Sequence, residues 1–174
     1  MPVFYSFLFT RIIMQGGQLR VMLDTNTYEF LLKNGFSKVK ALVKKGNLVV
    51  YGCKIIRDEF RDIPPSVKYD GKSFRNLLLQ VYDGLVKDHS FPIERVVDVL
   101  AEEYWKEYKG GVPKRKIMPD FLIVATATIH TLDIIVSEDD RTMKSKPCLR
   151  AYNKVNEKNG LNTPRFIRLN ELSL

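Results

Sequence analysis

Short apolar runs alternate with amphipathic segments along most of the chain. Three runs that are mostly apolar on both faces predict buried strands at 19–23, 48–51 and 133–136, and a last strand is expected at 165–169. Strands of this kind, separated by helices, are typical of a parallel sheet that is covered on both sides. We therefore expect an α/β fold with three layers, α/β/α, around a central, mostly parallel sheet of four to five short strands.

Apolar residues recur at helical spacing between these strands. The clearest case is segment 73–87, where the apolar positions follow the i, i+3, i+4, i+7, i+11 pattern of an amphipathic helix. Proline and glycine pairs end or separate several of the segments, as expected at helix boundaries. The other predicted helices are 27–33, 37–45, 55–63, 92–108, 119–132 and 146–158.

The first residues are apolar but do not predict a membrane segment. Residues 2–14 are too few to span a bilayer, and Arg11 interrupts them. Nothing basic precedes Arg11, which disfavours a secretory signal. Three explanations stay open: a weak signal, a true start at Met14 or Met22 that makes the segment an ill-ordered extension, and a strand or partner-binding segment. No other stretch approaches the length of a transmembrane helix.

Length and composition indicate a globular protein with one domain. The chain has 174 residues, 45% of them hydrophobic and 28% charged. We expect an N-terminal extension at 1–18 and a single domain at 19–174, with a helical insertion at about 64–111. Two cysteines cannot build a disulfide framework or a cysteine-rich zinc site, so a cytoplasmic location is the simpler expectation.

The charge of the chain favours a polyanionic partner. The 28 Lys and Arg residues exceed the 20 Asp and Glu residues by eight, which gives a net charge of +8. Such a balance favours nucleic acid over a membrane surface. It carries no information about the fold.

Four acidic residues lie at the predicted ends or starts of elements. Asp24 follows the first strand, Glu59 lies in the helix after the second strand, Asp120 begins an apolar helix, and Asp139 follows the third strand. Ligands gather at the carboxyl ends of the strands in parallel sheets. Mg²⁺ and Mn²⁺ bind oxygen ligands, which gives a basic protein a reason to bring carboxylates together.

Each of these acids also has an ordinary structural explanation. Asp24 and Asp120 are residues of the type that caps helix N-termini. Glu59 lies within reach of Arg57 and Arg61 on a solvated helix face. No single position is specific, so the hypothesis depends on the ordered set of four.

That set resembles the PIN-domain ribonucleases, the nuclease fold of the VapC-type toxins, over roughly Val21 to Leu169. The resemblance implies that the four acids bind Mg²⁺ or Mn²⁺ and that the protein cuts single-stranded RNA by metal-activated water. It implies that Asp24 and Asp120 hold the main ion while Glu59 and Asp139 complete the site. The motifs that carry it are Leu-Asp24-Thr-Asn26, Glu59, Pro-Asp120-Phe-Leu-Ile-Val-Ala-Thr-Ala and Ile-Val-Ser137-Glu-Asp139.

The resemblance also assigns supporting residues and leaves one position open. Asn26 would help to order the site, and Ser137 matches a Ser or Thr that the family has two residues before its last acid. Asp139 and Asp140 both stand near that position, and the alternative is that they simply open the next helix. The Ser-x-Asp spacing favours Asp139.

Basic residues near the acids are candidates for substrate binding. Segment 109–116 is expected to be a glycine-containing loop, and segment 141–168 is rich in Lys and Arg. A basic groove would follow the phosphates of a single strand, although a solvated basic face is the ordinary alternative. The residues assigned to this role are Lys114, Arg115, Lys116 and Arg141.

Several functional alternatives remain at this point. The start Asp24-Thr-Asn26-Thr27 is similar to that of haloacid-dehalogenase-type phosphatases, but Asn26 replaces their second acid. A non-catalytic RNA-binding protein on the same fold would have the same charge. The nuclease itself would be either a toxin held by a small antitoxin protein or an RNA-processing enzyme without one. A homodimer is also expected from the family and from the apolar central helices.

Overall fold

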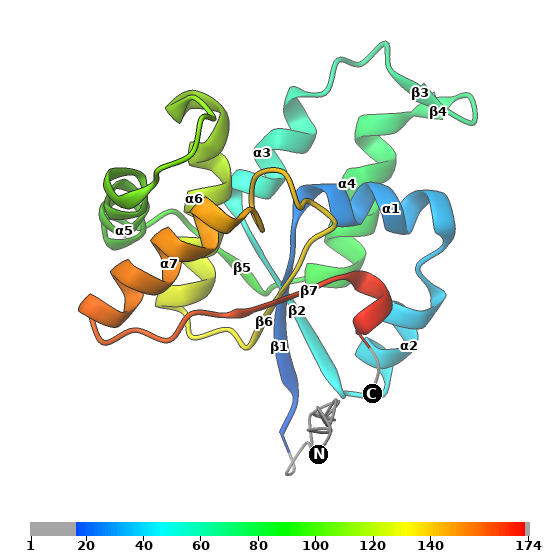
Figure 1. The fold of residues 1–174 in the computed structure, drawn as a ribbon. Coiled ribbons are helices and arrows are strands. Elements are labelled where there is room, and N and C mark those ends of the chain that lie inside the picture. The colour runs from blue at the N-terminus through cyan, green and yellow to red at the C-terminus, as the bar shows by residue number, and fades with distance from the viewer. Residues whose placement is uncertain (1–16, 173–174) are drawn as a thin grey trace, which may run out of the picture.

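A five-stranded parallel sheet forms the centre of the molecule, as Figure 1 shows. The structure, a computed structural model, describes residues 17–172. Every neighbouring pair in the sheet is parallel, and the strand order is β5-β2-β1-β6-β7. This confirms the predicted fold class. The strands are β1 (Leu19–Leu23), β2 (Leu48–Cys53), β5 (Ser90–Phe91), β6 (Ile134–Val136) and β7 (Arg165–Ile167).

Helices cover both faces of the sheet. Helices α5, α6 and α7 lie together on one side, and α1, α2 and α4 lie on the other, while α3 follows directly from β2 (Figure 1). A short 3₁₀ helix at Leu169–Glu171 follows β7. The helices are α1 (Thr25–Asn34), α2 (Ser37–Lys44), α3 (Lys54–Asp62), α4 (Phe74–Val86), α5 (Arg95–Glu107), α6 (Lys114–Ile129) and α7 (Lys146–Lys158).

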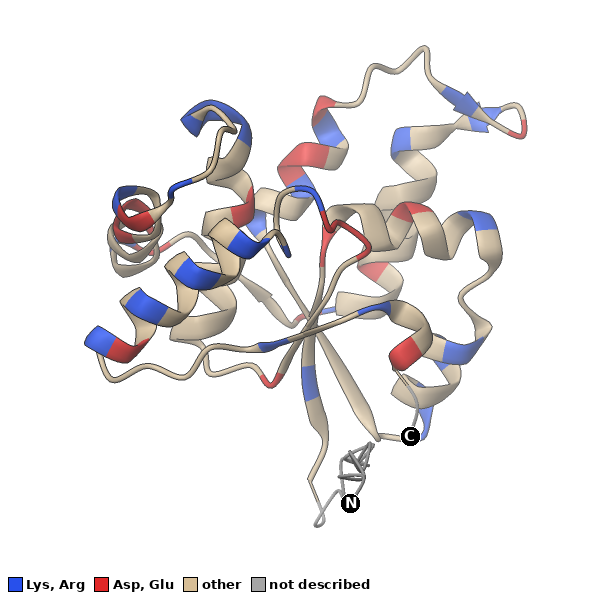
Figure 2. Ribbon diagram, in the orientation of Figure 1, with Lys and Arg blue, Asp and Glu red and all other residues tan. Residues whose placement is uncertain are grey.

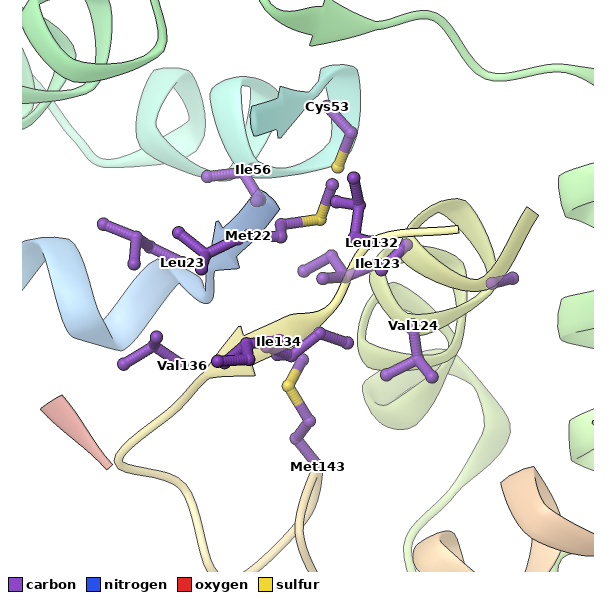
Figure 3. Close-up of a cluster of buried hydrophobic side chains, with 14 of the residues drawn as sticks. Met22, Leu23, Cys53, Ile56, Ile123, Val124, Leu132, Ile134, Val136 and Met143 are labelled. Carbon is purple, nitrogen blue, oxygen red and sulfur yellow. The ribbon is translucent and has the colours of Figure 1, made fainter. Parts of the chain in front are cut away.

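The core lies on both sides of β1, the middle strand. Val21 of β1 pairs with Val50 of β2 and with Ile134 of β6, so the apolar positions of three strands come into register. Val21, Met22 and Leu23 are completely buried, as expected for a strand that helices cover on both faces. Figure 3 shows part of this core, in which side chains from β1, α3, α6 and β6 converge with Met143.

A small antiparallel hairpin projects beyond α3 and α4. It consists of β3 (Lys68–Tyr69) and β4 (Lys72–Ser73), which the sequence pattern did not predict. Asp70 and Gly71 form its turn with φ angles of 47° and 72°. Positive φ at both central residues is the geometry that Asp-Gly favours in a two-residue hairpin loop.

The segment predicted as a helical insertion also contributes to the sheet. Ser90 and Phe91 of β5 pair with Gly52 and Cys53, so this segment supplies the edge strand beside β2. The predicted limits of the extension, the domain and the insertion stay predictions. Residues 1–16, the greater part of the predicted extension, lie outside the described residues.

Helix α6 begins earlier than the sequence pattern predicts. The expected start was Pro119 and the expected loop ended at residue 116, but Lys114, Arg115 and Lys116 form the first turn of the helix. Pro113 stands at the N-cap with extended φ and ψ, and Pro119 lies within the helix. Pro119 lacks an N–H, so one backbone hydrogen bond is lost there without ending the helix. Within residues 17–172, no helix is long and apolar enough to span a membrane.

Candidate active site

Four acidic side chains from different elements line one pocket. Asp24 follows β1, Glu59 lies on α3, Asp120 lies on α6, and Asp139 follows β6. The pocket has a volume of about 410 Å³ and opens at the carboxyl ends of the central strands. The structure therefore brings together all four acids that the sequence analysis grouped, although their chemical role stays a prediction.

Asp24 is the most deeply buried of the four. Its side chain is 4% exposed and accepts hydrogen bonds from the Thr25 backbone N–H at 2.7 Å and from the Ser137 hydroxyl at 2.8 Å. Asp24 is also the N-cap of α1, so it caps this helix and lines the pocket with the other acids at the same time. Burial raises the pKa of Asp24 to about 6, and the charges of Glu59 and Asp139 add to the rise against the two hydrogen bonds.

Asp120 has a different setting from the one its sequence position suggested. Because α6 begins at Lys114, Asp120 lies in the second turn, and the explanation of this residue as a helix cap is wrong. Burial raises its pKa to about 7, the nearby Thr142 hydroxyl opposes the rise, and the charges of Asp24 and Asp139 add to it. A cation bound beside this carboxyl would stabilise its anionic form and lower its pKa.

Glu59 faces the pocket rather than the neighbouring arginines. It accepts a hydrogen bond from the Thr25 hydroxyl. Arg57 and Arg61 form ion pairs with other carboxylates, so the alternative explanation of Glu59 as their partner is not found among the described residues. Burial raises the pKa of Glu59, the hydrogen bond from Thr25 lowers it, and the charge of Asp62 raises it further.

Asp139 is held by the loop that follows it. Its carboxylate accepts hydrogen bonds from the backbone N–H groups of Arg141 at 2.7 Å and Thr142 at 3.0 Å, and from the Thr142 hydroxyl. Burial acts to raise the pKa of Asp139, but these hydrogen bonds outweigh it and lower the pKa. Asp140 is exposed, forms ion pairs with Lys144 and Arg168, and does not line the pocket.

Ser137 and Asn26 connect the ends of the two central strands. The Ser137 hydroxyl is buried, donates to Asp24 and accepts from the Asp139 backbone N–H at 3.0 Å. The Asn26 side-chain oxygen accepts from the backbone N–H of Glu138 at 3.2 Å. These contacts connect Asp24 and the start of α1 to the loop that carries Asp139, and the supporting role of both residues in a functional site stays a prediction.

The donor chemistry of the pocket fits a hard divalent cation. All four candidate ligands are carboxylates, the oxygen donors that Mg²⁺ and Mn²⁺ prefer. Among residues 17–172, no group of three Asp, Glu, His or Cys side chains is placed to hold a single metal ion. Mg²⁺ commonly binds through only one or two carboxylates, with water and phosphate in its other positions, so a group of three protein ligands is not required.

The four basic candidates differ in their surroundings. Lys114 forms an ion pair with Glu102 of α5 at 2.7 Å, so its charge is directed away from the pocket. Arg115 and Lys116 are exposed in the first turn of α6, and Lys116 is one helical turn before Asp120. Arg141 is exposed and lies two residues after Asp139 in the chain. Figure 2 shows that basic positions follow the acidic segment in the loop after β6.

Two threonines and one apolar wall were missed by the sequence analysis. Thr25 holds Glu59, and Thr142 holds Asp139. The signal for Thr142 was present as a hydroxyl residue three positions after an Asp, a spacing that forms local turns. The wall had no signal in the sequence, because its members come from two separate segments, the end of α3 and the start of α4; they are Phe60, Ile63, Phe74 and Leu78.

Comparison with known proteins supports the fold. No protein-family model and no curated protein matches this sequence. VapBC2 from Rickettsia felis, solved bound to a DNA fragment from its promoter, is 13% identical with a TM-score of 0.54, over 86% of this chain and 98% of the other. DNA-bound VapBC from Salmonella typhimurium is 14% identical with a TM-score of 0.54, over 87% and 98%. At this identity the likeness shows that the chain has the PIN-like α/β fold of these structures.

Proposed function

We propose that this protein is a metal-dependent endoribonuclease that hydrolyses phosphodiester bonds of single-stranded RNA. The observation that carries the proposal is the pocket in which Asp24, Glu59, Asp120 and Asp139 converge at the carboxyl ends of the sheet. A fold shared with VapBC structures and a net charge of +8 agree with it.

The residues of the pocket are suited to holding Mg²⁺ or Mn²⁺. Asp24 and Asp120 would be the main ligands, and Glu59 and Asp139 would complete the site directly or through water. Such an ion supplies an acidified water as nucleophile and neutralises charge on the phosphate during hydrolysis. The raised pKa values of Asp24 and Asp120 mean that these groups gain most from a bound cation.

The surrounding residues would keep the ligands in place. Ser137 and Thr25 donate hydrogen bonds to Asp24 and Glu59, and Thr142 donates to Asp139. Each hydrogen bond orients a carboxylate without neutralising it. Pre-oriented ligands of this kind keep a catalytic site effective, because little reorganisation is needed when the substrate binds.

A small antitoxin protein is the proposed partner. Two solved structures that share this fold are VapBC complexes, and the motifs of this chain resemble VapC-type toxins. An antitoxin would bury the acidic pocket and place an Arg or Lys side chain among the carboxylates. A homodimer is part of the same proposal, and sedimentation that shows only monomer at micromolar concentration would count against it.

Cleavage of labelled single-stranded RNA tests the proposal. The wild type is expected to cut with Mg²⁺ or Mn²⁺ and not with EDTA. Asp24→Asn and Asp120→Asn should each lower the rate by roughly 100-fold or more, because each removes charge from the ion's main ligands. Asp140→Asn is the matched control, since Asp140 lies outside the pocket, and it should keep the activity.

The outcomes separate the alternatives. Cutting that survives in both pocket variants would mean a contaminant or a different site. RNA binding that weakens with salt, without any cutting, would favour the non-catalytic RNA-binding protein.

A further inference from the structure

The pocket that contains the acids has a second, apolar wall. Ile63, Phe74 and Leu78 line it opposite the ends of β1 and β6, next to the buried ring of Phe60. Ile63 and Phe74 are half-buried, so each presents part of its side chain to the pocket. A metal ion and a phosphate need only the acidic wall, and the apolar wall is left without a role in hydrolysis.

The β3–β4 hairpin holds Phe74 in place. The Phe74 backbone N–H donates to the Val67 carbonyl at 3.0 Å, across the base of the hairpin. The rings of Phe74 and Tyr69 have centroids 6.2 Å apart and are tilted by 45°. Ser73 caps α4 directly before Phe74. The ring is therefore fixed by a turn, a cap and an aromatic neighbour at the edge of the pocket.

The charges around this wall favour a neutral group inside and phosphates outside. Glu29 and Asp62 also line the pocket, so a phosphate is repelled from this side. Lys68 and Lys72 are exposed on the hairpin, and neither takes part in the ion pairs found within residues 17–172. In Figure 2 the projecting hairpin, which contains β3 and β4, carries basic positions at a distance from the acidic positions at the ends of the central strands.

We infer that Ile63 and Phe74, packed with the buried Leu78, form a nucleobase subsite, in which one base of the RNA stacks on the Phe74 ring beside the bond to be cut. This inference rests on the proposed function. A base is flat, apolar on its faces and uncharged, which matches a wall with an aromatic ring and no cation. Lys68 and Lys72 then contact the phosphates of neighbouring nucleotides along the hairpin.

A double-mutant cycle between protein and RNA tests the subsite without any cleavage. The parent is the full chain with Asp120→Asn, in EDTA, so that the RNA stays intact. Two ligands are titrated: a labelled RNA of ten nucleotides and a ribose-phosphate decamer of the same charge that has no bases. Removal of the bases should weaken binding to the parent by roughly 5- to 150-fold, the range for one stacked base.

The variants at Phe74 identify the ring as the stacking partner. Phe74→Ala and Phe74→Leu should bind the baseless decamer as the parent does and lose most of the preference for RNA with bases. Phe74→Trp should keep that preference. Phe30→Leu removes an aromatic ring that is 44% exposed on α1 and does not line the pocket, so it is the matched control and should behave as the parent. Thermal melting of each variant checks that the hairpin and α4 remain folded.

The inference would be overturned if removal of the bases lowered the affinity of Phe74→Ala and Phe74→Leu by as much as it lowers the affinity of the parent. Removal of the bases without any effect on the affinity of the parent would also overturn it. Because the readout is binding, a protein that never cuts RNA contradicts the proposed function and leaves this test intact. A protein that cuts RNA but shows no coupling at Phe74 contradicts only the subsite.

Discussion

The carboxyl groups of buried Asp24 and half-buried Asp120 lie beside other acids, and this setting determines the behaviour of the site at the scale of single residues. Their pKa values rise to about 6 and about 7, from an ordinary value of 3.8. Asp139, with its three hydrogen bonds from the following loop, has a lowered pKa. The pocket therefore combines one carboxylate that is stable as an anion with two whose anionic forms a bound cation would stabilise.

The raised pKa values predict a pH-dependent stability in the absence of divalent cations. Between the unfolded pKa and the folded pKa, the folded state binds more protons, so the free energy of unfolding falls as the pH rises. For Asp24 and Asp120 together, the loss between pH 5 and pH 8 should be on the order of 2–4 kcal/mol. Urea unfolding in EDTA at several pH values measures it.

Asp120→Asn should flatten this pH dependence and make the protein more stable at pH 8. Asp140→Asn should leave the slope unchanged, because Asp140 is exposed and paired outside the pocket. A wild type whose stability is constant or increases from pH 5 to pH 8 would contradict the electrostatic description of the pocket.

A second residue-scale prediction concerns Thr142. Thr142→Val removes the hydroxyl that donates to Asp139, so the pKa of Asp139 should rise toward its ordinary value and the loop should lose about 1 kcal/mol. Carboxyl chemical shifts followed by NMR during a pH titration measure the change. Thr142→Ser keeps the hydroxyl, so Asp139 should titrate in it as in the wild type. Identical titration of Asp139 in all three proteins would show that the Thr142 hydroxyl does not affect the pKa of Asp139.

At the scale of elements, the site is formed where strand ends and helix starts meet. Helices α5, α6 and α7 lie together on one face of the sheet, where α5 packs against both α7 and α6, the helix that carries Asp120. Tyr104 of α5 fixes this group of helices: its hydroxyl lies 2.7 Å from the Asn156 side-chain oxygen of α7 and 3.2 Å from the Thr128 hydroxyl of α6.

Tyr104→Phe should destabilise the protein by about 1–2 kcal/mol, because the Asn156 oxygen is buried and loses its donor. Chemical denaturation measures the loss. Tyr51→Phe is a suitable control, since no hydrogen bond of the Tyr51 hydroxyl is found within the described residues. Equal stability of wild type and Tyr104→Phe would show that this network contributes nothing to the packing of α5 against α6 and α7.

The elements also show what could be predicted from the sequence. Strand β1 and helix α7 match the predicted ranges, because an apolar run and a long amphipathic pattern are strong signals. Strands β3, β4 and β5 were missed because two residues are too few to show any alternation. The start of α6 was misplaced because Lys114–Lys116 is polar and Pro119 resembles a helix start, whereas Pro113 holds that position.

The same limits apply to the candidate site. Asp24, Glu59, Asp120 and Asp139 were found because each lies at a predicted element boundary, and parallel strands bring such boundaries to one edge of the sheet. The apolar wall was not found, since only tertiary packing brings Ile63 and Phe74 to the same pocket.

At the scale of the whole molecule, the protein carries a net positive charge, whereas its candidate active-site pocket is lined by acidic residues. The net charge of +8 predicts that the logarithm of the RNA-binding constant falls linearly with the logarithm of the salt concentration. Arg115→Gln with Lys116→Gln should lower the magnitude of that slope by about 1–1.5, at about 0.7 for each phosphate contact.

Lys44→Gln with Lys45→Gln removes the same charge at the exposed end of α2, away from the pocket, and serves as the control. Fluorescence titrations of labelled RNA between 50 and about 200 mM salt measure both slopes. Equal slopes for the two double variants would mean that the start of α6 does not contact the RNA backbone.

The most direct test of the central claim compares two neighbouring aspartates. Asp139 lines the pocket, and Asp140 stands outside it in ion pairs with Lys144 and Arg168. We expect Asp139→Asn to lower the rate at which labelled single-stranded RNA is cut in Mn²⁺, and Asp140→Asn to cut at the rate of the wild type. Loss of cutting in Asp140→Asn with full activity in Asp139→Asn would contradict the assignment of the pocket as the active site.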